Sequence, residues 1–134
     1  MSFFNGWVIS KDSRQSLLEL FKPKWAERVV AAHITNEFVR GDVPLHPFNP
    51  FPKIMVIGMV ADDNAQSLLV TIDDEFRRPD DGYFHCTWSL LPDYDNVRPV
   101  LGGQIKNPER GIVGWPLWKG GIVIEDCQPI WKGH

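Results

Sequence analysis

A chain of 134 residues, 43% of them hydrophobic and 23% charged, is typical of one globular domain spanning residues 1–134 with a sizeable core. Its net charge of −3 argues against a protein that grips duplex nucleic acid, because such binding depends on many Lys and Arg contacts to phosphates. No apolar run is long enough to cross a bilayer, the first residues do not resemble a signal peptide, and Cys86 and Cys127 form no CxxC pair. We therefore expect a reduced, cytoplasmic setting and no membrane partner.

In chain order, the sequence predicts mostly strands and one clear helix. The helix is expected over residues 11–21, with Asp12 or Ser13 as its N-cap, because leucines and Phe21 form an apolar face and Pro23 follows. Strands are expected where β-branched and aromatic residues cluster, over residues 6–10, 27–38, 53–61, 67–72, 83–91 and 115–126. Turn-forming residues dominate at 40–52, 62–64, 73–82 and 92–114. This pattern predicts a strand-rich α+β domain with few helices.

The most specific pattern is a His-x-Thr motif that occurs twice, as His33-Ile34-Thr35 and His85-Cys86-Thr87. Because side chains alternate along a strand, each motif places an imidazole and a hydroxyl on one face of a sheet. The opposite face, toward the core, is expected to receive Ile34, Phe84, Cys86 and Trp88. The chain has only four histidines. Random placement would produce two such motifs roughly four times in a thousand.

Two histidines on one face suit the cleavage of a phosphodiester, which needs a base for the attacking oxygen and an acid for the leaving oxygen. Imidazole, with an unperturbed pKa of about 6.5, serves either role near neutral pH. We expect His33 and His85 to be this catalytic pair, and the hydroxyls of Thr35 and Thr87 to bind the non-bridging phosphate oxygens. The pattern does not say which histidine is the acid. This chemistry needs no metal and no cofactor.

These two motifs resemble those of the 2H phosphoesterase superfamily, which is named for two His-x-Thr/Ser motifs. The resemblance covers roughly residues 29–91 closely and the whole chain loosely, and it matches the order of strand, helix, first motif, two strands and second motif. It implies a small two-lobed antiparallel-sheet fold and cleavage of 2′,3′-cyclic phosphates or of 2′,5′ and 3′,5′ linkages. The implied partner is a small nucleotide or oligonucleotide, because family members act on RNA ends, nucleotide metabolites or cyclic-nucleotide immune signals. The substrate, the pathway and the oligomeric state stay open.

Aromatic residues in loops are the remaining candidates for binding a substrate. Phe48 follows the first motif, and Trp115 and Trp118 lie in a stretch rich in Gly and Pro. Each could stack on a nucleobase, or the three could form a small hydrophobic cluster under the loops. His46 lies in a proline-rich loop and is expected to stay outside the chemistry, and Cys86 is expected to be a packing residue rather than a nucleophile.

Three alternatives remain open. Histidine and threonine in apolar strands can be ordinary packing residues. The domain could instead bind a nucleotide or an RNA end without cleaving it. It could also be a metal protein that uses His33, His46 and His85.

Overall fold

All the strands that the structure describes belong to one antiparallel sheet. The computed structural model describes residues 2–41, 45–61, 65–79, 82–92, 112–115 and 121–133. Its elements are β1 (Ser2–Val8), α1 (Lys11–Leu20), the 3-10 helix η1 (Ala26–Arg28), β2 (His33–Arg40), β3 (Ile54–Ala61), β4 (Ala65–Ile72), β5 (His85–Leu90), β6 (Ile112–Trp115), β7 (Ile122–Ile124) and β8 (Gln128–Gly133). This composition agrees with the prediction of a strand-rich α+β domain.

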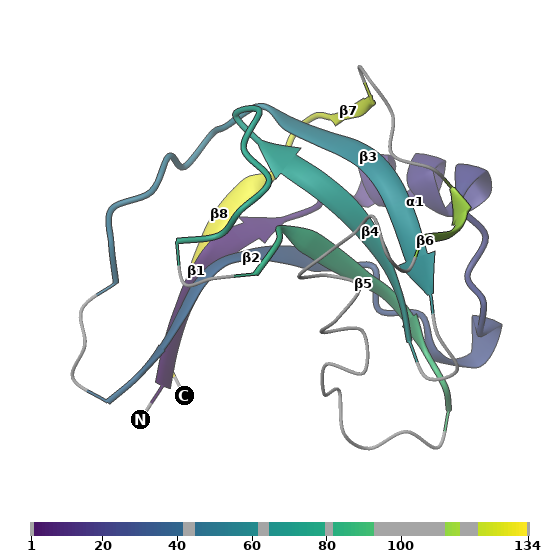
Figure 1. Ribbon diagram of the computed structural model, residues 1–134, viewed down its shortest axis with the longest axis horizontal. Helices are drawn as coiled ribbons and strands as arrows, with labels where there is room; N and C mark the ends of the chain where they lie inside the picture. Colours follow the sequence, from purple (N-terminus) through teal and green to yellow (C-terminus); the bar gives the residue numbers. More distant parts are fainter. Residues whose placement is uncertain are drawn as a thin grey trace.

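The sheet is curled, and its strand order brings together segments that are far apart in the sequence. The order is β6-β3-β4-β5-β2-β1-β8, and β7 also pairs with β3. Figure 1 shows the strands bending into an arch, with β1, β2 and β8 in one limb and β3 and β4 in the other. The two parts of the sheet join where β2 lies beside β5, and both His-x-Thr motifs are at this junction.

Helix α1 begins where the sequence predicts, but a different residue caps it. The hydroxyl of Ser10 accepts a hydrogen bond of 3.1 Å from the backbone N–H of Ser13. The N-cap is therefore Ser10, and the prediction of Asp12 or Ser13 is wrong by two or three residues. Ser13 instead donates from its own hydroxyl to the backbone oxygen of Glu125, 2.9 Å away. Leu17 is buried whereas Leu20 is 50% exposed, so the apolar face is narrower than predicted.

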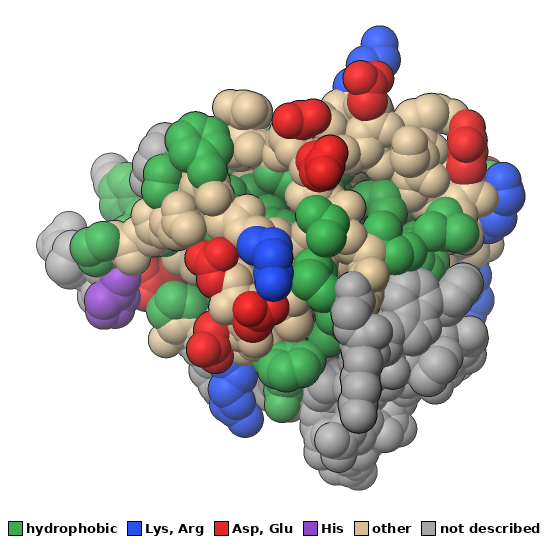
Figure 2. All heavy atoms as spheres, turned by 90° about the horizontal axis from the view of Figure 1, so that it is seen from above, with side chains coloured by type: hydrophobic (Ala, Val, Ile, Leu, Met, Phe, Trp, Pro, Cys, Tyr) green, Lys and Arg blue, Asp and Glu red, His purple; other side chains and the backbone are tan. Residues whose placement is uncertain are grey.

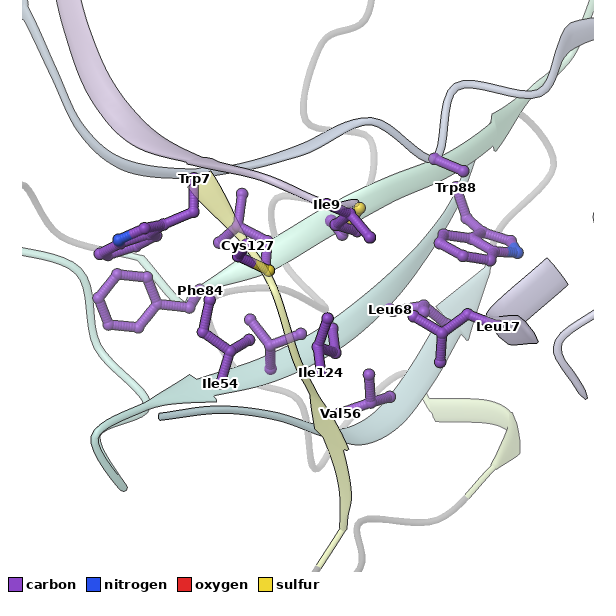
Figure 3. Packing of buried hydrophobic residues seen from close by; sticks show 14 of the residues in the cluster. Trp7, Ile9, Leu17, Ile54, Val56, Leu68, Phe84, Trp88, Ile124 and Cys127 are labelled. Atoms are coloured by element: carbon purple, nitrogen blue, oxygen red, sulfur yellow. The ribbon is translucent and has the colours of Figure 1, made fainter. Parts of the chain in front are cut away.

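The main core fills the inside of the curled sheet. Figure 3 shows Trp7 beside Phe84, and Trp88 at the end where Leu17 of α1 joins the packing. Both indoles are fully buried and each N–H donates to a backbone oxygen, Trp7 to Asn49 at 3.0 Å and Trp88 to Phe21 at 2.8 Å. These bonds avoid the penalty of an unpaired buried donor, which is about 1–3 kcal/mol. The core is therefore apolar without leaving its tryptophan donors unsatisfied.

Several strands differ from the sequence-based expectation. Strand β1 starts at Ser2 rather than at residue 6, and β8 occupies a segment for which no strand was expected. The two pair along their length, from Phe3 with Gly133 to Val8 with Gln128. Strand β6 also lies within the segment expected to be a loop, where it pairs with β3. Pairing between distant segments, which local alternation does not reveal, stabilises these strands.

Two predicted segments lie partly or wholly outside the residues that the structure describes. The predicted turn at 62–64 and most of the predicted loop, residues 93–111, lie outside the described residues. Within the described segments, none of the helices has the length and the hydropathy that crossing a bilayer requires.

Candidate functional site

The two His-x-Thr motifs lie side by side on neighbouring antiparallel strands. Ile34 of β2 is the Cα partner of Cys86 of β5. In an antiparallel ladder the flanking residues then face each other, so His33 lies beside Thr87 and Thr35 lies beside His85. Each histidine has the threonine of the other motif as its neighbour across the strands. The predicted convergence of the motifs on one sheet is confirmed at the level of strand register.

Burial confirms which way the side chains point. Ile34, Cys86 and Trp88 are fully buried in the main core and Phe84 is 4% exposed, as the alternation predicts. The intervening residues, His33, Thr35, His85 and Thr87, are all half-buried. Because alternate residues of a strand occupy opposite faces, these four side chains share the face of the sheet that is turned away from the main core. We call them the histidine–threonine cluster.

A break in β structure just before the first motif sets this register. Val29 pairs with Ser89, whereas Ile34 pairs with Cys86, so four residues (30–33) lie opposite two (87–88). Ala31 accommodates the extra residues with a positive φ of 42°, and its backbone N–H donates to the backbone oxygen of Thr87, 3.0 Å away. The strand predicted over residues 27–38 therefore begins only at His33. This irregular segment places the first motif opposite the second.

Contacts hold both imidazoles in the cluster. His85 Nδ1 lies 2.9 Å from the backbone oxygen of Tyr83, an acceptor that can bond only to a protonated ring nitrogen. This bond favours the tautomer with the proton on Nδ1 and presents Nε2 as the second functional nitrogen. His33 packs against the ring of Phe4, with ring centroids 5.7 Å apart and planes inclined by 35°. The rings therefore have defined neighbours rather than being surface residues in open solvent.

A cavity of about 610 Å³ adjoins the cluster on the β1–β2–β8 side. Among the described residues that line it, His33 and Thr35 are polar and the others are apolar: Phe4, Val8, Ala32, Phe38 and Ile130. This volume lies within the range of roughly 300–1,000 Å³ that is typical of pockets for small molecules. Sequence reasoning missed Phe4 and Phe38 as site residues, because Phe4 precedes the first expected strand and Phe38 reads as an ordinary strand position.

A β-bulge explains why Phe38 shares a face with His33. Strict alternation would point Phe38 away from His33, since the two are five positions apart, an odd number. The pairing between β1 and β2 shifts at this point, from Asn5 with Glu37 to Gly6 with Thr35, so Asn36 is an extra residue. Beyond the bulge, Phe38 is the direct partner of Phe4. Asn36 and Glu37 become buried instead, and Asn36 Nδ2 donates to Asn5 Oδ1 at 3.0 Å.

His46 lies apart from the cluster, as the sequence predicts. Glu37, whose side chain is 3% exposed, accepts a bond of 2.7 Å from the backbone N–H of His46 and lies 2.6 Å from its Nδ1. Glu37 is paired with Asn5 and so lies on the opposite face from the partners Phe4 and Phe38. His46 thus fastens the loop that follows β2 to a buried carboxylate.

Of the predicted substrate-binding aromatics, Phe48 has a described side chain, and it does not join the cluster. Phe48 packs against the core residue Trp7, with ring centroids 5.5 Å apart, which accounts for it as a hydrophobic contact under the loop. Trp115 contributes the backbone of β6, paired with Met59, and its side chain lies outside the described part. Trp118 lies outside the described residues altogether.

Cys86 is a packing residue, in agreement with the sequence analysis. It is fully buried, and burial raises the pKa of its thiol to about 12, with a smaller contribution from the nearby Cys127. Since the thiolate is the nucleophilic form, this thiol is unreactive near neutral pH. No three His, Cys, Asp or Glu side chains gather as a metal-ligand group among the described residues.

Comparisons with protein-family models, with curated proteins and with solved structures find no match to this chain, so the histidine–threonine cluster itself carries the functional argument.

Proposed function

We propose that this protein is a metal-independent phosphodiesterase of the 2H type, which cleaves a small nucleotide or oligonucleotide with His33 and His85 as its acid–base pair. The observation that carries the proposal is the register of Ile34 with Cys86, which gathers both motifs on one face. Chance placement of two His-x-Thr motifs does not require them to become direct neighbours with the same orientation. The arch of the sheet, with the motifs where its two parts join, also suits the two-lobed fold that the resemblance implies (Figure 1).

The cluster has the groups that hydrolysis of a cyclic phosphate needs. One neutral imidazole accepts a proton from water as the water oxygen attacks phosphorus. The other imidazole, protonated, donates its proton to the ribose oxygen as the bond from phosphorus to that oxygen breaks. The net change is the addition of one water, and the two histidines finish with exchanged protonation states. Thr35 and Thr87, each beside a histidine of the other motif, donate hydroxyl hydrogen bonds to the non-bridging oxygens.

The charge distribution supports a small substrate. The molecule is acidic overall, with a net charge of −3. On the face seen in Figure 2, Lys and Arg side chains lie apart from one another and among acidic ones. Long nucleic acids are usually bound through many basic contacts to phosphates. A single phosphodiester at the cluster needs few such contacts.

The test is turnover on a panel of 2′,3′-cyclic nucleotides, cyclic dinucleotides and 2′,5′-linked oligoadenylates, followed by mass spectrometry with and without a chelator. We expect at least one member to be cleaved equally in both conditions, and His33→Ala and His85→Ala each to remove that activity. Binding without cleavage would favour the non-catalytic binding module instead. Activity that the chelator abolishes would favour the metal protein and contradict the proposal.

A further inference from the structure

The apolar cavity beside His33 has a floor that suits a flat aromatic ring. Phe4 and Phe38 are direct partners across β1 and β2, and both line the cavity. Gly6 lies between Phe4 and Val8 on the same strand and brings no side chain to this face. Ile130 of β8, the partner of Gly6, completes the wall on the far side. The result is an open, aromatic depression over three adjacent strands.

The cavity is continuous with the histidine–threonine cluster, since His33 and Thr35 belong to both. Phe38 is 39% exposed and Val8 is 36% exposed, so apolar surface is presented to whatever occupies the cavity. Apart from the ionisable His33, none of the lining residues that the structure describes carries a charged side chain. This lining suits an uncharged group with a large apolar face, attached to whatever binds at the two motifs.

We propose that this cavity is a nucleobase subsite, in which Phe4 and Phe38 stack on the base whose phosphate is bound by the histidine–threonine cluster. The proposal rests on the proposed function for the position of the phosphate, and it goes further in assigning the residues that hold the base. Aromatic side chains stack on any base, because every base has a π face. Because His33 and Thr35 are the polar groups among the described lining residues, recognition depends on the ring rather than on its hydrogen-bonding edge.

The β-bulge at Asn36 is part of this subsite. Without the extra residue, Phe38 would point to the core side and Glu37 would take its place beside His33. A carboxylate at that position would repel the phosphate. The bulge therefore supplies the aromatic floor and removes a negative charge from it in one step.

The test is calorimetric binding of four probes to the wild-type protein: adenosine 3′-monophosphate, uridine 3′-monophosphate, ribose 5-phosphate and octyl phosphate. Stacking on one base predicts that the nucleotide binds about 5- to 150-fold more tightly than ribose 5-phosphate. Uridine 3′-monophosphate should bind within about tenfold of the adenosine nucleotide if the ring is what is recognised. Tighter binding of octyl phosphate than of either nucleotide would overturn the proposal in favour of an alkyl pocket.

Variants at Phe38 separate stacking from simple apolarity. Phe38→Leu should remove most of the preference for the nucleotide over ribose 5-phosphate, whereas Phe38→Trp should retain it. Phe51→Ala is the matched control, because Phe51 is 68% exposed and lines a different cavity. Equal nucleotide affinity in wild type and Phe38→Leu would overturn the subsite.

The same measurements distinguish this proposal from the proposed function. If phosphodiesters are cleaved but Phe38→Leu changes neither affinity nor KM, the subsite is wrong and the enzyme assignment stands. If nucleotides bind through Phe38 but no phosphodiester is cleaved, the subsite stands and the catalytic assignment is wrong. If nucleotides neither bind nor react, both are wrong.

Discussion

Gly6 and Ile34 approach each other more closely than any side chain at position 6 would allow. A Cβ atom on Gly6 would lie 2.1 Å from the backbone oxygen of Ile34 and 3.0 Å from the Cα of Thr35. The contact involves backbone on β2, so no rotamer change relieves it. Gly6 is also the register partner of Thr35. The close approach thus ties β1 to the first His-x-Thr motif.

Gly6→Ala should therefore destabilise the protein and disturb the site. Overpacking against backbone typically costs about 1–3 kcal/mol, and the displaced β2 would shift Thr35 relative to His85. We expect a lower unfolding midpoint in urea and a reduced kcat at a temperature where the variant is folded. Gly41→Ala is a control. Gly41 has a positive φ of 74°, but a Cβ atom added to it would meet no described atom within 4 Å. The change should therefore lower stability by about 1 kcal/mol and leave kcat unchanged. Equal effects of both changes on kcat would contradict the positional role of Gly6.

His46→Ala should affect stability and not catalysis. The change removes the partner of Glu37 Oε2, a carboxylate oxygen in a side chain that is 3% exposed. Leaving a buried polar group without its partner costs about 1–3 kcal/mol. Thermal unfolding should reveal this loss, while kcat at low temperature stays near the wild-type value. A dead but fully folded His46→Ala protein would show that the wrong histidines have been assigned to the chemistry.

Substitutions in the histidine–threonine cluster should have graded effects. General acid–base catalysis contributes about 10²- to 10⁴-fold, so His33→Ala and His85→Ala should each lower kcat by at least that much. The double variant should lose far less than the product of the single losses, because the two groups act as a unit. Thr35→Val and Thr87→Val should be milder, since proton transfer remains possible. Full activity in His85→Ala would exclude the paired mechanism.

Turnover should depend on pH along a bell-shaped curve. One imidazole must be neutral and the other protonated, so the rate should fall at both low and high pH. The two apparent pKa values belong to the pair rather than to single residues. The measurement is kcat/KM between pH 4 and pH 10 on the substrate that the panel identifies. A rate that rises steadily to pH 10 would indicate attack by free hydroxide instead.

The buried thiols should make the fold sensitive to alkali. Burial raises the pKa of Cys86 to about 12 and that of Cys127 to about 11, above the ordinary value of 9.0. Above pH 9 the thiols ionise in the unfolded chain while they stay protonated in the folded one. The free energy of unfolding should then fall by about 1.4 kcal/mol per pH unit for each thiol, up to the folded pKa. Urea unfolding between pH 8 and pH 11 should show a flatter decline for a Cys86→Val, Cys127→Ala double variant than for wild type.

The sequence predicts the face of each motif residue because that information is local. The alternation around Ile34 and Cys86 is regular over the residues that matter, and their burial follows it. The strand class and the position of α1 were predictable for the same reason, since apolar periodicity and a following proline act within a few residues.

The cavity was not predictable, because it depends on two features that leave little trace in one sequence. The bulge at Asn36 reverses the alternation, so Phe38 reads as a residue on the wrong face. Ile130 comes from β8, which is recognisable only through its pairing with β1. The loop position of Phe48 suggests a contact with substrate, yet its ring lies against Trp7. Loop location indicates exposure poorly when the loop folds back onto a core.

The pairing of β8 with β1 has a consequence for how the chain acquires its structure. β1 lies between β2 and β8, and its pairing with β8 forms only when residues 128–133 are in place. The first described strand therefore cannot complete its hydrogen bonds before the last one is available. Pairing over such a sequence separation slows folding, because the chain must lose the entropy of closing a long loop before the contacts between the two strands can form. Until then β1 exposes unpaired backbone groups next to the apolar Phe3 and Phe4, a template for association with another chain. Deleting residues 128–133 should therefore promote aggregation, because the backbone groups of β1 that pair with β8 would stay exposed in the folded protein. In the intact chain, β8 pairs with these groups and prevents that association.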